Sequence, residues 1–191
     1  MGKKKDIITV IAVVAASVLI IAGVSFVISN RDGGADRKRA QKLSADVQEE
    51  IAALKEDIPE PDKDTFITVD NKVVVGSVEI SSLNIKYPVL NTFNKNTAAY
   101  SLCRNGSSMP WDIEGMTIYG VDSFTEVLSE LKAGDVMVFE DLAGEKSEYK
   151  YINNEEDNVN NVIDYGIEIC NVDKSGKIKM RYMFEPVRRK Q

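Results

Sequence analysis

An uncharged apolar run near the start of the sequence restricts what the rest of the chain can fold into. The run covers residues 7–28, which are 22 residues without a charge. At about 1.5 Å per residue, a helix of this length crosses a hydrocarbon core of about 30 Å. The run exceeds the roughly 7 to 15 apolar residues of a cleaved signal peptide, and residues 29–32 do not resemble a cleavage site. We therefore expect a transmembrane anchor at 7–28, preceded by a short tip at 1–6.

The charge and the rare residue types exclude several classes of function. The formal net charge is -6, which argues against a nucleic-acid-binding protein. Two cysteines, Cys103 and Cys170, are too few for a disulfide scaffold or a four-cysteine zinc site. The sequence contains no histidine. The chain by itself therefore cannot supply a Cys-His pair, a histidine metal ligand or the usual proton shuttle near neutral pH, and no cofactor is indicated.

The segment after the apolar run has the pattern of an amphipathic helix. Between residues 35 and 57, apolar residues recur every three or four positions with charged residues between them: Ala40, Leu43, Val47, Ile51 and Leu54. This stripe is too short to favour a coiled coil, so the helix is expected to form a stalk or to pack on the domain. Pro59 and Pro61 end it. We expect a stalk and linker at 29–65, a folded domain at 66–187 and a solvated tail at 188–191.

The folded domain is expected to be mainly β. Short runs rich in β-branched residues, separated by turn residues, indicate a barrel or a sandwich. These runs are 72–80, 85–90, 116–119, 135–140, 148–152, 166–171 and 178–184. A capping-box pattern at 123–126, apolar Phe124 and Leu128, and a terminating Gly134 predict one helix among the strands. The polar residues 153–161 predict a long solvated loop.

Four segments of the β domain follow one another in an order that is typical of one family. They are Val75-Gly76-Ser77-Val78-Glu79-Ile80 with Tyr87-Pro88-Val89-Leu90, Thr117-Ile118-Tyr119-Gly120 with Phe124, Leu128, Leu131 and Gly134-Asp135, Gly166-Ile167-Glu168-Ile169-Cys170, and Arg181-Tyr182-Met183-Phe184. In this order they resemble the sortases, the membrane-anchored cysteine transpeptidases of Gram-positive bacteria, and the Tyr-Pro-Val motif is closest to class B. The resemblance implies an eight-stranded sortase-like β-barrel outside the cell and an N-terminus in the cytoplasm.

The resemblance assigns two catalytic roles and leaves a third without its usual residue. Cys170 matches the family's nucleophile and Arg181 matches its arginine, whereas the position of the catalytic histidine falls on Val121. A cysteine attacks as its thiolate, and the departing amine needs a proton that a guanidinium with a pKa above about 12 does not donate. Asp122 or Tyr119 could supply this proton only if its pKa moved far from the ordinary values of about 3.9 and 10.

We therefore expect a degenerate sortase-like protein that is impaired in transpeptidation, or lacks it, and acts as a surface or cell-wall binding module. Its partner would be a sorting-signal peptide or a cell-wall or pilus component. The alternative is an active sortase that uses Cys170 and Arg181 with a substitute acid. A third interpretation is an unrelated anchored β domain, in which these two residues would not share a cleft.

Two interpretations of individual residues stay open beside these hypotheses. Cys103 and Cys170 could form a disulfide if their Cα atoms come within about 7 Å. The acidic residues Glu155, Glu156 and Asp157 could hold Ca²⁺, although their spacing matches no ligand template and a solvated loop is favoured.

Overall fold

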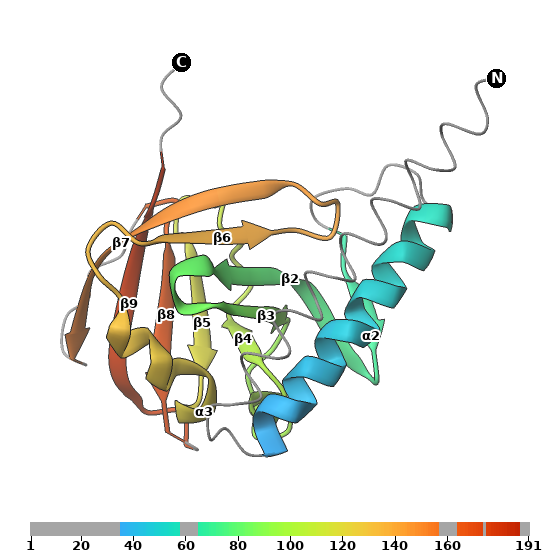
Figure 1. The fold of residues 1–191 in the computed structure, drawn as a ribbon, viewed down its shortest axis with the longest axis horizontal. Helices are drawn as coiled ribbons and strands as arrows, with labels where there is room; N and C mark the ends of the chain where they lie inside the picture. The colour runs from blue at the N-terminus through green and yellow to red at the C-terminus, as the bar shows by residue number, and fades with distance from the viewer. Residues whose placement is uncertain (1–34, 58–64, 157–163, 174, 188–191) are drawn as a thin grey trace. The chain divides into compact units, whose positions relative to one another are not determined.

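The strands of this protein form one sheet that closes on itself. The computed structural model describes residues 35–57, 65–156, 164–173 and 175–187. Within these ranges the strands are β1 (Ile67–Val69), β2 (Lys72–Ile80), β3 (Ile85–Leu90), β4 (Leu102–Asn105), β5 (Met116–Gly120), β6 (Val136–Glu140), β7 (Lys146–Glu156), β8 (Ile167–Val172) and β9 (Ile178–Pro186). Their order is β1-β2-β3-β4-β5-β8-β9-β7-β6, and a further pairing of β2 with β6 closes an eight-stranded barrel, to which β1 is added (Figure 1). The expected closed barrel of mainly β structure is confirmed.

The connections place β8 between two strands that are distant from each other in sequence. β8 pairs in parallel with β5 on one side and antiparallel with β9 on the other. β3 and β4 form the other parallel pair, and the remaining described pairings are antiparallel. The strand that carries Cys170 is therefore flanked by the strand that precedes Val121 and by the strand that carries Arg181.

The strand pattern in the sequence differs from the structure most clearly at β7. This strand continues to Glu156 and so includes residues that the sequence predicted to be loop. A register shift between Tyr151 and Asn153 marks a bulge, after which Asn153 and Glu155 pair with Met183 and Arg181 of β9. The polar residues are thus held by hydrogen bonds to β9 and not by burial, which is why their composition did not indicate a strand. Residues 157–161 of the predicted loop lie outside the described residues.

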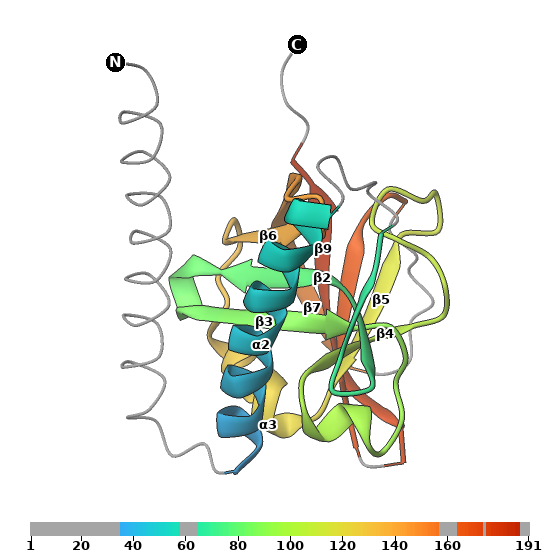
Figure 2. The ribbon, with the colours of Figure 1, turned by 90° about the vertical axis from the view of Figure 1, so that its right-hand side faces the viewer.

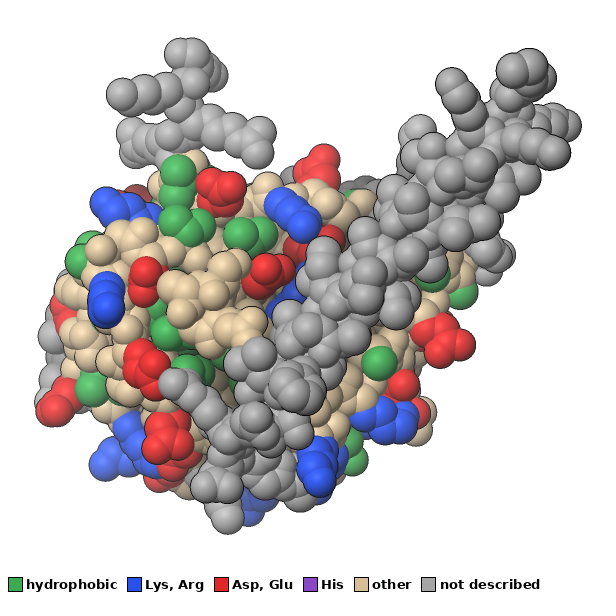
Figure 3. Space-filling model, in the orientation of Figure 1, with side chains coloured by type: hydrophobic (Ala, Val, Ile, Leu, Met, Phe, Trp, Pro, Cys, Tyr) green, Lys and Arg blue, Asp and Glu red, His purple; other side chains and the backbone are tan. Residues whose placement is uncertain are grey.

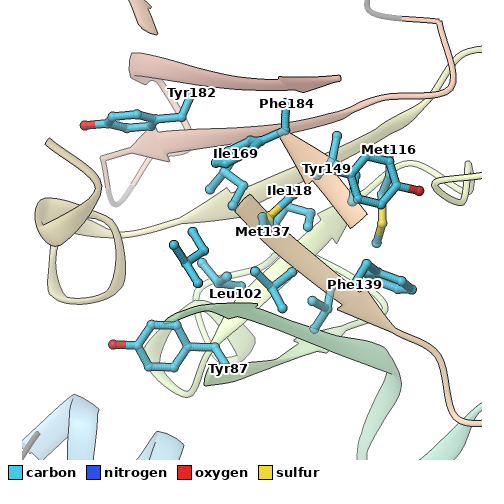
Figure 4. Close-up of a cluster of buried hydrophobic side chains, with 14 of the residues drawn as sticks. Tyr87, Leu102, Met116, Ile118, Met137, Phe139, Tyr149, Ile169, Tyr182 and Phe184 are labelled. Carbon is cyan, nitrogen blue, oxygen red and sulfur yellow. The ribbon is translucent and has the colours of Figure 1, made fainter. Parts of the chain in front are cut away.

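Alternate residues of the strands fill the barrel. Ile118 of β5, Ile169 of β8 and Tyr182 of β9 are paired in register, and all three belong to one buried cluster. Figure 4 shows these side chains together with others of the same cluster. The others include Leu102 of β4, Met137 and Phe139 of β6, and Phe184 of β9. Because side chains alternate between the two faces of a strand, the residues adjacent to Ile169 point to the outer face of the barrel wall.

The predicted amphipathic helix is α2 (Ala35–Asp57), and it packs on the outer face of the barrel. Leu43 and Val47 of α2 form a second buried cluster with residues from β1, β2, β3, β4 and the β6–β7 turn: Ile67, Val69, Val74, Leu90, Cys103 and Leu142. Figure 2 shows α2 running alongside this part of the sheet. Of the two predicted arrangements, the packed helix therefore describes α2.

The predicted transmembrane anchor at 7–28 lies outside the described residues. Among the helices that the structure describes, none combines enough length with enough apolar character to cross a bilayer.

The helix after β5 begins differently from the sequence expectation. It consists of α3 (Asp122–Thr125) followed by the 3₁₀ helix η3 (Glu126–Glu130), with Phe124 and Leu128 buried as predicted. Shorter 3₁₀ turns lie at Ser81–Leu83 (η1) and Thr97–Ala99 (η2). The predicted capping box is wrong, because Val121 is the N-cap residue and Ser123 Oγ instead donates a hydrogen bond to Asp36 of α2 at 3.3 Å.

Gly120 fixes the junction between β5 and this helix. A Cβ atom at Gly120 would lie 2.6 Å from Leu102 Cδ2 and 2.6 Å from Thr125 Cγ2, so only glycine fits here without displacing its neighbours. The close approach holds Val121 and Asp122 directly at the end of β5, beside the strand that carries Cys170.

Candidate active site

Cys170 and Arg181 lie directly opposite each other on neighbouring strands. The register pairs Cys170 of β8 with Arg181 of β9 and with Tyr119 of β5. Directly paired residues of a sheet point to the same face, with Cβ atoms about 5 Å apart. Because Ile169 points into the barrel, these three side chains share the outer face of the wall. The two residues that the resemblance selected are therefore neighbours.

These residues belong to a longer line across the outer face, which we call the outer row. It contains one residue from each of six neighbouring strands: Leu90, Cys103, Tyr119, Cys170, Arg181 and Glu155. Its two cysteines are both fully buried, with exposed fractions of 0%. Cys103 and Cys170, near the middle of the outer row, are therefore shielded from solvent, although the row lies on the outer face of the barrel.

The two cysteines do not form a disulfide. Both are free thiols, and Tyr119 of the intervening strand β5 separates them in the register. Two strand spacings of about 4.8 Å put their Cα atoms about 10 Å apart, which exceeds the roughly 7 Å limit for a disulfide. The interpretation of Cys103 and Cys170 as a disulfide is therefore wrong.

Cys103 is held as a neutral thiol by its surroundings. It lies in the second buried cluster under α2, and its Sγ donates a hydrogen bond to the Ser101 carbonyl oxygen at 3.5 Å. Burial raises the pKa of Cys103 to about 11, and a hydrogen bond with Thr97 acts weakly in the opposite direction. At neutral pH this thiol packs as a small apolar side chain and is not a nucleophile.

The raised pKa of Cys103 predicts an alkaline loss of stability. An unfolded chain releases the thiol proton near pH 9.0, whereas the folded chain keeps it until about pH 11. The unfolded state therefore gains free energy from deprotonation as the pH rises, and the contribution of Cys103 to folding falls by about 1 kcal/mol between pH 8 and pH 10. Urea unfolding of the wild type and of Cys103→Ala measures this effect. Their difference in unfolding free energy is expected to shrink over this pH range, and a constant difference would contradict the assignment.

Arg181 is engaged by a carboxylate that the sequence analysis did not select. Its Nη1 donates a hydrogen bond to Glu168 Oε1 at 2.6 Å. Glu168 precedes Cys170 by two residues in β8 and therefore points to the same face of the wall. Because side chains alternate between the two faces of a strand, the two-residue spacing of Glu168 and Cys170 could have identified Glu168 from the sequence. The pair is mostly buried, with side-chain exposed fractions of 19% and 17%, whereas the charges visible in Figure 3 are of both signs and lie on the surface.

A second carboxylate flanks Arg181 from the other side. Glu155 of β7 is the register partner of Arg181 and faces outward with it. Two carboxylates therefore accompany one guanidinium beside Cys170, without the net positive charge that stabilises a thiolate. The other ligands suggested for a calcium site are Glu156 and Asp157, and Asp157 lies outside the described residues. Among the residues that are described, no three carboxylate or thiol side chains gather closely enough to share a metal ion.

The position assigned to histidine and its neighbour lie at the end of β5. Val121 packs against the main core of the barrel. Asp122 accepts hydrogen bonds from Lys179 Nζ at 3.0 and 2.8 Å on its two carboxylate oxygens. The hydrogen bond to Lys179 lowers the pKa of Asp122 below its ordinary value. A general acid would need the opposite direction, so Asp122 is unsuited to replace histidine near neutral pH.

Tyr119, the other substitute considered for histidine, is engaged in an aromatic contact. Its ring packs edge-on against Phe93 of the β3–β4 connection, with ring centroids 5.2 Å apart and planes at 79°. Phe93 was not selected from the sequence, because nothing near position 93 indicates a contact with β5.

Comparisons with known proteins identify the fold of this chain. No protein-family model and no curated protein sequence matches it. Among solved structures, a Clostridium perfringens sortase D5 transpeptidase aligns with a TM-score of 0.54 and 12% identity, over 80% of this chain and 98% of that chain. Sortase C-3 from Streptococcus pneumoniae aligns with a TM-score of 0.52 and 20% identity, over 76% of this chain and 84% of that one.

A third similar structure is a Clostridium perfringens sortase C described with the C-terminal cell wall sorting motif. It aligns with a TM-score of 0.51 and 19% identity, over 90% of this chain and 99% of that chain. At these identities the comparisons concern the fold, and they confirm the expected sortase-like barrel. The resemblance to class B and the roles of Cys170 and Arg181 stay predictions.

Proposed function

We propose that this chain is a sortase-like protein that binds an extended peptide of the sorting-signal class and lacks ordinary transpeptidation. The surroundings of Cys170 carry this proposal. The thiol is fully buried, the adjacent Arg181 is held by Glu168, and Val121 stands where the resemblance expects histidine. The proposed ligand class rests on the fold shared with the sortase C described with a cell wall sorting motif.

The chemistry of peptide cleavage explains why these features disfavour turnover. Transpeptidation requires a thiolate, stabilisation of the oxyanion and a proton for the departing amine. Glu168 competes with the thiolate and with the oxyanion for the Arg181 guanidinium. The lowered pKa of Asp122 leaves its carboxyl group ionised, so that it has no proton to donate. General acid-base catalysis is worth about 10² to 10⁴ in rate, and an ionised Asp122 does not replace the general acid that histidine would supply.

The proposal also includes a location. The apolar run at 7–28 would anchor the protein with its N-terminus in the cytoplasm and the barrel outside the cell, where cell-wall or pilus components are accessible. The class B resemblance of residues 85–90 belongs to the same proposal.

Peptide assays with the full chain in detergent or nanodiscs test the proposed function. Fluorescent LPxTG-like and NPxTN-like peptides are expected to bind saturably without cleavage over hours, with or without an added amine acceptor. Cys170→Ala is the matched control and is expected to keep this binding, because the proposed interaction does not use the thiol as a nucleophile. Cleavage at the rate of an ordinary sortase, or failure to bind either peptide, would contradict the proposal.

A further inference from the structure

We propose that residues 92–98, which we call the cap, close over the outer row and must move before Cys170 becomes accessible. The cap lies in the connection between β3 and β4, and the structure describes all of it. The inference rests on the proposed function for the identity of the ligand, whereas the movement itself is tested independently of any ligand.

The cap contacts one member of the outer row and the buried cluster that contains two others. Phe93 is partly buried against the second cluster, to which Leu90 and Cys103 belong. The Phe93 ring packs edge-on against Tyr119, the next residue along the row, with centroids 5.2 Å apart. The next member after Tyr119 is Cys170, which is fully buried. The cap is therefore placed on the same face as Cys170 and one strand away from it.

Phe93 also reaches the connection that follows β8. A Cβ atom at Gly176, in the β8–β9 turn, would lie 3.4 Å from Phe93 Cε1. The ring thus packs on β5 on one side of β8 and lies beside the β8–β9 turn beyond its end. Because Cys170 is near the end of β8, an aromatic ring in this place covers the approach to its thiol. Gly176 has a φ of +88°, a conformation that favours glycine, and the missing side chain leaves room for the ring.

The hydrogen bonds of the cap lie mainly within the cap. Asn94 Oδ1 accepts hydrogen bonds from the backbone N–H groups of Asn96 and Thr97 at 2.8 and 3.1 Å. Thr97 Oγ1 donates to the Thr92 carbonyl oxygen at 2.7 Å, and the Ala98 N–H donates to the Asn94 carbonyl oxygen at 2.9 Å. The cap can therefore move as a preformed turn without losing these bonds.

The residues on both sides of the cap are fixed to the barrel. The Asn91 N–H donates to the Val73 carbonyl oxygen at 2.8 Å, and Ser101 Oγ donates to the Pro88 carbonyl oxygen at 2.5 Å. A movement would therefore be confined to the intervening residues, with hinges next to Asn91 and Ser101. A peptide that binds along the outer row must displace Phe93, which couples peptide binding to opening of the cap.

Alkylation of the two cysteines in the full chain tests the cap. Iodoacetamide is added at pH 8, and peptide mapping by mass spectrometry follows Cys170 and Cys103 separately. In the wild type, both thiols are expected to react slowly. Phe93→Ala is expected to accelerate alkylation of Cys170 at least tenfold and to leave Cys103 slow, because α2 also covers Cys103. Phe66→Ala, which truncates a phenylalanine with an exposed fraction of 64%, is the control and should change neither rate.

The two thiols distinguish opening of the cap from general loosening of the fold. An unchanged Cys170 rate in Phe93→Ala would overturn the inference, as would an equal acceleration of Cys103 and Cys170. The sorting-signal peptides used for the proposed function are then titrated against the same variant. Faster alkylation of Cys170 together with tighter peptide binding supports both proposals. Faster alkylation without binding of any peptide leaves the cap established and contradicts the proposed ligand.

Discussion

Val121→His combined with Glu168→Gln is expected to increase acyl-enzyme formation on Cys170 by about 10² to 10⁴ relative to the single Glu168→Gln variant. The new imidazole would follow β5 directly, two residues beyond Tyr119, the register partner of Cys170. It could then take the thiol proton and return it to the departing amine. Glu168→Gln removes the carboxylate that lies 2.6 Å from the Arg181 guanidinium, so that less negative charge competes with the anions of catalysis for Arg181.

Intact-mass spectrometry of the full chain with a sorting-signal peptide measures this gain. All variants carry Phe93→Ala, so that access to Cys170 does not limit the rate. Val121→Asn with Glu168→Gln is the matched control, because an amide is polar and planar but does not titrate near neutral pH. The gain should also follow an ionisation near pH 6.5, the ordinary pKa of histidine. Equal acylation in the asparagine control would show that Val121 does not occupy the place of a catalytic base.

The sequence predicts the strands of the barrel better than the contacts on its outer face. β2 and β3 have the predicted bounds, because β-branched residues and turn residues mark them locally. β1 and β4 have only three and four residues, too few to show a period, and they were missed. The apolar stripe of α2 indicated a buried face but not its partner, because the partner residues come from distant parts of the chain.

The same distinction applies to the candidate active site. The adjacency of Cys170 and Arg181 was expected from the family resemblance, and the register of β8 and β9 places them opposite each other. The contact of Glu168 with Arg181 depends on that register, and the contact of Phe93 with Tyr119 depends on the path of a connection between strands. Neither register nor path has a local signature in the sequence, so both contacts required the structure.

The Glu168–Arg181 pair is expected to contribute strongly to stability, so that Arg181→Met lowers the free energy of unfolding by about 3 to 5 kcal/mol. The substitution removes the guanidinium and leaves the mostly buried Glu168 without its 2.6 Å partner, beside Glu155 on the same face. Lys179→Met is the matched control on the same strand. Its pair with Asp122 is exposed, with side-chain fractions of 47% and 62%, and its loss should cost less than about 1 kcal/mol.

A double-mutant cycle measured by urea unfolding separates the pair from its surroundings. Glu168→Leu combined with Arg181→Met should cost less than the sum of the single substitutions, because removing both partners leaves neither of their charges uncompensated. A coupling of more than about 1 kcal/mol would show that Glu168 holds Arg181 in solution as it does in the structure. Strict additivity would contradict this contact, and with it the argument that a carboxylate competes with the anions of catalysis for Arg181.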